Sequence, residues 1–318
     1  MSDFLQCEVG VPQGSNLGPL LFLIFYNDLP NFLNCELDAY ADDSTLTVTA
    51  KSIDEIGESL TENCELVSEW MLGNKLKLNA DKTHLMTVGT SERLRSLEDK
   101  VKVVMDGFTL EESRDKVETL LGCQIEPGLK WHKQVDELIG KLRKRLTGLA
   151  HLRNIIPYNL RKTITEGMFT SVLAYCLPLF GGCDKEELLS LQVMQNKAAR
   201  LVTHSPIRAP RKEMLAQLGW LSVNQLIFYH SALSTYRIRQ SREPEYLSSL
   251  LVRDGRTGKI IVSNTNLTLA KKSYSYRGAA QWNTIPENIR VVRRISQFKV
   301  QLRKWILLSV TQFVDAQN

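Results

Sequence analysis

The chain has 318 residues, of which 43% are hydrophobic and 24% charged, and this composition excludes a disordered or low-complexity protein. Its net charge of +5 is divided unevenly: residues 1–128 carry 10 basic against 23 acidic side chains, and residues 129–318 carry 30 against 12. An acidic part followed by a strongly basic part indicates a polyanionic partner for the second part, most simply a nucleic acid.

No membrane or targeting segment is visible in the sequence. The longest apolar run, residues 17–25, is too short to span a bilayer, and no basic region precedes an apolar stretch at the N-terminus. The six cysteines lie far apart and show no zinc-binding spacing. We therefore expect an intracellular protein, nuclear or cytoplasmic, whose thiols are reduced.

Strand and helix patterns alternate in the first part of the chain. A loop over residues 10–16 leads into an apolar helix that ends near residue 29. Two strand-like runs, 36–40 and 44–49, flank Ala41-Asp42-Asp43 and predict a hairpin with the acidic pair at its tip. The apolar spacing then predicts an amphipathic helix over 52–72. Further strand-like pieces follow at 76–78, 84–88, 101–105 and 120–125.

From Trp131 onward the pattern is one helix after another. The predicted helices, separated by proline and glycine, cover residues 135–153, 159–174, 185–203 and 211–239. We place domain boundaries after residues 128 and 205, which gives three regions: 1–128, 129–205 and 206–318.

The adjacent carboxylates of Asp42 and Asp43 are the sharpest chemical signal. Two such groups on a tight hairpin cannot both enter a core, and a divalent cation relieves their repulsion, as in two-metal phosphoryl-transfer sites. The simpler alternative is a polar turn, because Asp is a favoured turn residue.

Two further motifs flank the acidic pair. Gly10-Val11-Pro12-Gln13-Gly14-Ser15 lies upstream, and its glycines let backbone approach a ligand closely. Asn79-Ala80-Asp81-Lys82-Thr83 lies downstream and brings a lysine toward phosphate oxygens, or forms a solvated turn. With Tyr40-Ala41-Asp42-Asp43 between them, the three motifs resemble the palm of reverse transcriptases from non-LTR (LINE-type) retrotransposons.

The resemblance is strongest over residues 8–90 and continues more loosely at 120–132 and 277–290. It implies an α+β fold. In this fold residues 1–128 form a partial polymerase palm, an antiparallel sheet with helices. An all-α thumb-like region follows over 129–205, and a basic helical C-terminal region over 206–318.

The resemblance also implies roles for individual residues. Asp42 would bind both Mg²⁺ (or Mn²⁺) ions and Asp43 would be its partner. Tyr40 would pack beneath the primer end and the incoming nucleotide. The templating base pair and the leaving pyrophosphate would be contacted by four further residues: Gln13, Gly14, Ser15 and Lys82. The implied partners are an RNA template, a DNA primer and deoxynucleoside triphosphates, with no membrane.

One departure from the family limits the expected activity. The family uses a further metal-binding aspartate on a strand before the first motif, and basic fingers that hold the triphosphate. The segment before Val9 contains Asp3 as its sole aspartate and does not resemble that strand. We therefore expect the chain as given not to polymerise DNA by itself. The alternative is a non-catalytic nucleic-acid-binding remnant, while an unrelated structural protein would require three ordered motifs by chance.

Basic side chains gather on the first predicted helix of the second part. Four of them are Lys141, Arg143, Lys144 and Arg145, followed by Arg153, Arg161 and Lys162. Such a face could follow a template–primer backbone, although a solvated face is the alternative. A second cluster lies near the end, at Arg290, Arg293, Arg294, Lys299, Arg303 and Lys304. The aromatic residues beside it, Trp282, Phe298 and Trp305, are interpreted as core.

Overall fold

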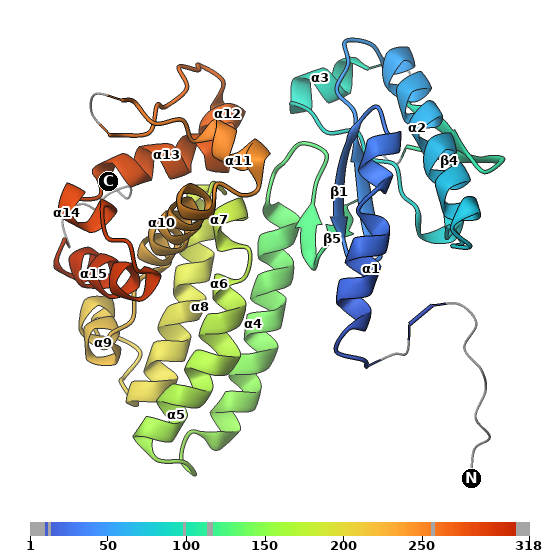
Figure 1. The fold of residues 1–318 in the computed structure, drawn as a ribbon. Helices are drawn as coiled ribbons and strands as arrows, with labels where there is room; N and C mark the ends of the chain where they lie inside the picture. The colour runs from blue at the N-terminus through green and yellow to red at the C-terminus, as the bar shows by residue number, and fades with distance from the viewer. Residues whose placement is uncertain (1–9, 12–13, 98–99, 113–116, 256–257, 310–318) are drawn as a thin grey trace, which may run out of the picture. The chain divides into compact units, whose positions relative to one another are not determined.

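The computed structural model describes residues 10–11, 14–97, 100–112, 117–255 and 258–309. The chain divides into two compact units, Met1–Glu118 and Thr119–Asn318 (Figure 1). The division falls slightly before the boundary expected after residue 128. No second division appears near residue 205, because one hydrophobic core joins residues from Cys123 to Ile306.

The first unit is built from two hairpins and the helices that cover them. Its elements are α1 (Gly18–Tyr26), the 3₁₀ turn η1 (Leu29–Phe32), β1 (Glu36–Tyr40), β2 (Asp43–Thr47), α2 (Ile53–Gly73), the 3₁₀ turn η2 (Ala80–Lys82), α3 (Ser91–Ser96), β3 (Lys102–Met105) and β4 (Phe108–Glu111). β1 pairs with β2 and β3 pairs with β4, both antiparallel.

The expected palm sheet is present only as separate two-stranded hairpins within the described residues. The pieces predicted at 76–78 and 84–88 are extended chain without strand pairing. Their leucines still pack on the core: Leu76 and Leu78 contact one apolar cluster, and Leu78 and Leu85 contact another. Their alternating apolar pattern therefore reflects packing rather than a ladder of backbone hydrogen bonds.

Helix α2 holds the first unit together. Its N-terminus is capped by the Ser52 hydroxyl, which accepts a hydrogen bond from the backbone N–H of Glu55 at 3.2 Å. Val67 and Trp70 pack toward α1 and the β1–β2 hairpin, and Cys64 packs toward β3. The polar face predicted from the sequence is exposed and consists of Glu55, Glu58, Glu62, Glu65 and Glu69.

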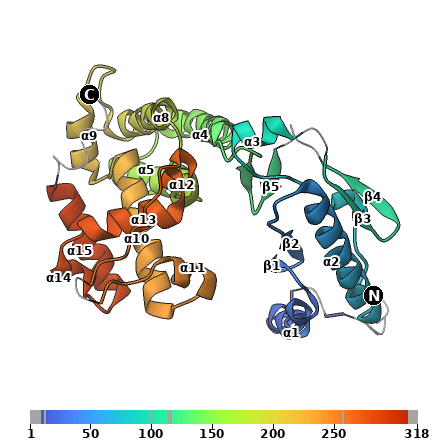
Figure 2. The ribbon, with the colours of Figure 1, turned by 90° about the horizontal axis from the view of Figure 1, so that it is seen from above.

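The second unit is helical apart from a small hairpin. Its elements are β5 (Glu118–Leu120), β6 (Cys123–Ile125), α4 (His132–Leu152), α5 (Tyr158–Thr165), the π-helical turn η3 (Glu166–Thr170), α6 (Ser171–Ala174), α7 (Leu177–Phe180), α8 (Lys185–Thr203), α9 (Arg211–Leu218), α10 (Val223–Ser241), α11 (Glu245–Leu250), α12 (Thr268–Lys272), α13 (Tyr274–Thr284), α14 (Glu287–Arg290) and α15 (Ile295–Leu308). Within this unit α10 packs against α7, α8, α13 and α15 (Figure 1 and Figure 2).

The predicted helices of this part are confirmed with two corrections. The helix expected over 159–174 is interrupted by the π-helical turn η3. The helix expected over 211–239 is two helices, because Gly219 takes φ 66° at the end of α9 and Ser222 caps α10. Trp282 and Phe298 are buried as expected, and Trp305 packs against the same core. None of the helices in the described ranges is both long and apolar enough to cross a membrane.

The described cysteines differ in the pKa of their thiols. The Cys123 thiol, as hydrogen-bond donor, lowers the pKa of Cys176 to about 7, whereas burial raises the pKa of Cys64 to about 11 and of Cys183 to about 12. Since the thiolate is the nucleophile, Cys176 should react with iodoacetamide at pH 7.5 at least about tenfold faster than the other described cysteines.

Mass spectrometry of briefly labelled protein measures this difference directly. The Cys176 rate should rise as the pH passes through 7 and then level off, because the thiolate predominates above its pKa. Cys176→Ser should remove the fast phase. Fast labelling that persists at Cys64 or Cys183 of the folded protein would contradict the assignment.

Candidate functional site

The acidic pair lies at the tip of the first hairpin. Tyr40 pairs with Asp43 across the two strands, which leaves Ala41 and Asp42 as the loop and makes Asp43 the first residue of β2. Ala41 has φ 55°, a left-handed conformation that costs a residue with a Cβ about 1 kcal/mol. Such a tight loop keeps both carboxylates at the surface.

The register of the strands separates an anchoring face from an open one. Leu37 pairs with Leu46, and both pack on the cluster formed by α1 and α2. The Ser44 hydroxyl is hydrogen-bonded to the Tyr26 hydroxyl of α1. Because side chains alternate along a strand, Tyr40 and Asp43 lie on the opposite face, together with Asp38.

Both carboxylates are available to a cation. Asp42 and Asp43 are exposed, and the side chain of neither forms a hydrogen bond or an ion pair with any residue that the structure describes. Tyr40 is 67% exposed beside them. Asp38, which lies outside the three motifs, adds a third exposed carboxylate on the face of Tyr40 and Asp43.

The residues of the flanking motifs have defined local roles. Gln13 lies outside the described residues. Gly14 is exposed with φ 81°, which favours glycine, and Ser15 Oγ accepts a hydrogen bond from the N–H of Gly18 at 2.8 Å, at the start of α1. Lys82 ends η2, exposed, and its N–H donates to the Asn79 carbonyl at 3.1 Å. In the described chain, no hydrogen bond or ion pair joins Lys82 to the acidic pair.

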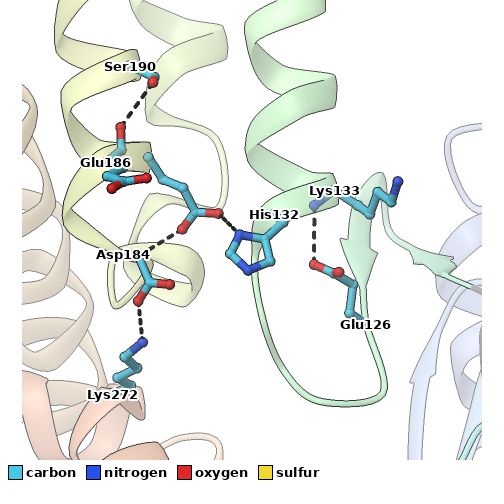
Figure 3. A network of polar contacts seen from close by, with 8 residues as sticks. Glu126, His132, Lys133, Asp184, Glu186, Ser190 and Lys272 are labelled. Carbon is cyan, nitrogen blue, oxygen red and sulfur yellow. Dashed lines mark hydrogen bonds and ion pairs between the residues drawn. The ribbon is translucent and has the colours of Figure 1, made fainter. Parts of the chain in front are cut away.

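A second group with metal-ligating atoms occurs in the described residues, at the start of α8. His132, Asp184 and Glu187 each offer a ligand atom within 4.8 Å of the others (Figure 3). The sequence feature that marks two members of this group is the capping box Asp184-x-x-Glu187 at the start of α8.

These ligand atoms are already used in a structural network. Glu187 contacts the His132 ring and accepts a hydrogen bond from the N–H of Asp184 at 2.7 Å. Lys272 Nζ donates to Asp184 Oδ1 at 2.6 Å, and this bond lowers the pKa of Asp184 (Figure 3). The positive end of the α8 dipole also disfavours a metal cation. The network therefore joins α4, α8 and α12 rather than holding a metal.

The basic side chains predicted to follow a nucleic-acid backbone fall into two groups. Lys141, Arg143, Lys144 and Arg145 are all exposed on α4. Lys141 forms an ion pair with Glu137 at 2.6 Å, and Arg145 donates to the Met168 carbonyl at 3.0 Å. All four remain accessible to solvent and to a polyanion.

Arg161 does not belong to that surface. It is buried, and its guanidinium donates to the carbonyls of Val202 at 3.0 Å, Arg153 at 2.7 Å and Ile156 at 3.1 Å. These carbonyls lie at or near the C-terminal ends of α8 and α4, where the last carbonyls of a helix have no intrahelical N–H donor. The charge pattern alone could not distinguish this internal cap from a surface cation.

Comparison with known proteins finds similarity over the first part of the chain. Residues 2–136 match the family described as reverse transcriptase (RNA-dependent DNA polymerase). The RNA-directed DNA polymerase from mobile element jockey of Drosophila funebris is 27% identical over 210 residues, which are 63% of this chain and 22% of that protein. The first part of the chain is therefore similar to reverse transcriptases of mobile elements.

Two further relatives extend the similarity into the second unit. The probable RNA-directed DNA polymerase from transposon X-element of Drosophila melanogaster is 23% identical over 279 residues, 83% of this chain and 30% of that protein. The corresponding protein from transposon BS is 24% identical over 245 residues, 73% of this chain and 26% of its own. The chain thus spans less than a third of the length of these relatives. No solved structure matches it.

Proposed function

We propose that this chain forms part of a polymerase that copies an RNA template into DNA, with Asp42 and Asp43 as its metal-binding carboxylates. The observation that carries the proposal is an exposed acidic pair on a hairpin tip, with no side-chain partner among the described residues, within a segment that matches the reverse transcriptase family. Primer extension on an RNA template, compared between the parent and a variant without the Asp42 carboxylate, tests the proposal.

The residues at the hairpin tip suit a divalent metal ion. Carboxylate oxygens are the ligands that Mg²⁺ and Mn²⁺ prefer, and Mg²⁺ in polymerase sites is held by one or two carboxylates plus water and substrate phosphates. Asp42 and Asp43 supply two such groups, exposed and without competing cationic partners among the described residues. A bound metal lowers the pKa of the primer hydroxyl and neutralises charge on the phosphoryl group.

The remaining residues position the reactants around that centre. Tyr40 offers an exposed ring next to Asp43, against which the primer end and the incoming nucleotide pack. Gln13, Gly14 and Ser15 line the templating base pair. The primer 3′-hydroxyl loses its proton to water and its oxygen bonds to the α-phosphorus, while the bond between that phosphorus and the leaving pyrophosphate breaks. Lys82 donates a proton to the pyrophosphate.

The architecture proposed for the chain follows from the same comparison. The first unit would act as a palm segment and α4 as part of a thumb. The four cations of α4 would then contact the phosphates of the RNA template and DNA primer. Phosphate contacts of this kind carry little sequence preference and weaken steeply with salt.

Charge reversal on α4 should weaken binding of a template–primer duplex. Changing Lys141, Arg143, Lys144 and Arg145 together to Glu should lower affinity about thirtyfold at moderate salt and reduce the salt slope, because phosphate contacts are lost. Fluorescence anisotropy with a labelled RNA–DNA hybrid measures both quantities. The double change Arg143→Glu with Lys144→Glu should lower affinity about fivefold. It preserves the contacts of Lys141 with Glu137 and of Arg145 with the Met168 carbonyl.

A matched variant separates local contacts from net charge. Reversal of the exposed residues Lys185, Lys197, Arg208 and Lys212 changes the net charge equally and should lower affinity less than about threefold. Equal losses in the two variants, or an α4 variant that binds like the parent, would refute the proposed role of α4.

A further inference from the structure

Helix α15 buries one face and presents a basic face to solvent. Phe298, Leu302 and Ile306 are buried in the core of the second unit. Residues 288–309, which include the whole helix, carry six basic side chains and no acidic one. The second basic cluster predicted from the sequence therefore lies on a segment that has no acidic side chain of its own.

The neighbouring helix α10 supplies no negative side chain either. Gln225 Nε2 donates to the Ile306 carbonyl at 3.4 Å, and the rings of Tyr236 and Phe298 stack with their centroids 4.2 Å apart. These contacts hold α10 and α15 side by side and antiparallel, and α10 contains no Asp or Glu. The positive charge of α15 is thus not neutralised by the helix that packs along it.

Three cations of this face are available to a ligand. Arg293, Arg294 and Lys304 are exposed, and their side chains form no hydrogen bond or ion pair with any residue that the structure describes. Arg303 is also exposed, and its Nη2 donates to the Gly219 carbonyl at 2.6 Å, which holds this side chain in place. Because guanidinium and ammonium groups form charge-assisted hydrogen bonds with phosphate oxygens, the face has the donors that a phosphate backbone requires.

An exposed apolar line runs between the cations of α15. Val300 is 68% exposed and Leu307 is 37% exposed, and both lie on one line because seven residues make about two helical turns. Successive residues of a helix are about 100° apart, so Arg303 and Lys304 fall on opposite sides of this line. The outer face of α15 therefore offers apolar contact in the middle and positive charge at both edges.

We propose that the exposed face of α15 binds single-stranded nucleic acid, and that an unpaired segment of the RNA template is its ligand. A single strand offers phosphates and open base faces together, so the cations and the apolar line both gain contacts. The choice of the RNA template rests on the proposed function, whereas the choice of a single strand rests on the face itself. This surface is separate in sequence from α4, for which a duplex is proposed.

Two other polyanionic partners fit this face less well. A duplex keeps its base faces inside the stack, so it would leave Val300 and Leu307 without an apolar contact. An anionic membrane requires a helix whose broad apolar face enters the lipid. The broad apolar face of α15 is not available to lipid, because Phe298, Leu302 and Ile306 are each 0% exposed.

Removing the three available cations should weaken binding of a single strand. A triple variant with Arg293→Gln, Arg294→Gln and Lys304→Gln should bind a labelled oligouridylate of about 16 nucleotides about tenfold more weakly at moderate salt. The salt slope should fall by about two, since each phosphate contact to a single strand contributes about 0.7. Fluorescence anisotropy of the full chain over a salt series measures both quantities.

Two further variants separate this face from net charge. Lys185→Gln, Lys197→Gln and Lys271→Gln together make the same charge change at exposed positions on other helices, and should lower affinity less than about twofold. Val300→Ser should lower affinity about threefold at an unchanged salt slope, because it removes an apolar contact and no charge. Circular dichroism melts of each variant verify that the chain is folded.

A blunt RNA–DNA hybrid separates the inference from the proposed function. The triple variant should bind the hybrid within about twofold of the parent, whereas charge reversal on α4 weakens that binding. Equal losses for the single strand and the hybrid, or a parent that does not bind oligouridylate, would overturn the inference and leave the proposed function standing. Cation-dependent binding of oligouridylate by a chain that does not bind the hybrid would support the inference while the proposed function fails.

Vesicles of phosphatidylserine test the membrane alternative. The parent should not sediment with them under conditions in which it binds oligouridylate, because its broad apolar face is buried. Sedimentation with vesicles that needs Arg293, Arg294 and Lys304, without binding of oligouridylate, would assign the face to an anionic membrane surface and overturn the inference.

Discussion

Asp42→Asn should reduce primer extension about a thousandfold in the polymerase polypeptide that includes this chain. Asparagine preserves the shape of the side chain but removes the charge that binds the metal ions. A thousandfold loss corresponds to about 4 kcal/mol of transition-state stabilisation, in the range expected when an electrostatic element of the site is removed. Extension of a DNA primer on an RNA template, with Mg²⁺ and separately with Mn²⁺, measures the loss.

The hairpin provides its own control for this experiment. Asp38→Asn removes an exposed carboxylate from the same strand pair while leaving the loop intact, and should lower extension less than about threefold. Binding of the RNA–DNA hybrid should persist in both variants. If Asp38→Asn were as damaging as Asp42→Asn, the general charge of the hairpin rather than the tip would be responsible. An active Asp42→Asn variant would remove Asp42 from the catalytic centre.

Arg161→Ala should lower the free energy of unfolding by about 3 kcal/mol. This loss corresponds to a decrease of more than about a hundredfold in the ratio of folded to unfolded protein. The change leaves the carbonyls of Val202, Arg153 and Ile156 without their donor, in a place that water does not readily reach. Unsatisfied buried polar groups cost about 1–3 kcal/mol each when a single partner is removed. Thermal melts of the full chain should show a loss of about 6–12 °C in the transition of the second unit.

An exposed arginine gives the comparison. Arg143→Ala on α4 should change stability by less than about 0.5 kcal/mol, since its side chain is exposed and forms no hydrogen bond or ion pair with the described residues. The effects on affinity for the RNA–DNA hybrid should be the reverse of those on stability. Arg143→Ala should lower the affinity, whereas Arg161→Ala should leave the affinity of the folded molecules unchanged. A stable Arg161→Ala variant with weakened binding would return Arg161 to the nucleic-acid surface.

Local signals were sufficient to predict several elements from the sequence. The hairpin of β1 and β2 was predicted from two short strand-like runs around an Asp-rich turn. Its strands are neighbours in the chain, so their pairing needs no distant partner. Helix α8 covers the predicted residues 185–203, because its capping box and apolar spacing are both local. The motifs around Asp42 also predicted the family whose description matches residues 2–136.

Other features depend on partners that are distant along the chain. Leu76, Leu78 and Leu85 alternate like strand residues, but their apolar contacts are supplied by the clusters around α2, without strand pairing. The separation of α9 from α10 needed a left-handed Gly219, and the sequence shows the glycine without showing that the chain turns there.

The arginines show most clearly what tertiary structure decides. Arg143 and Arg161 are both helical cations in the sequence, yet one is exposed and the other donates to carbonyls at or near two helix ends. Arg239 of α10 lies over the ring of Trp282 on α13, 5.0 Å from its centroid, a contact between residues far apart in the sequence. The sequence by itself determined the total charge, the motifs and most helices, since these depend on neighbouring residues. Only the fold decided which charges are buried, paired or gathered, because the free energy of a charge depends on the groups brought around it in space.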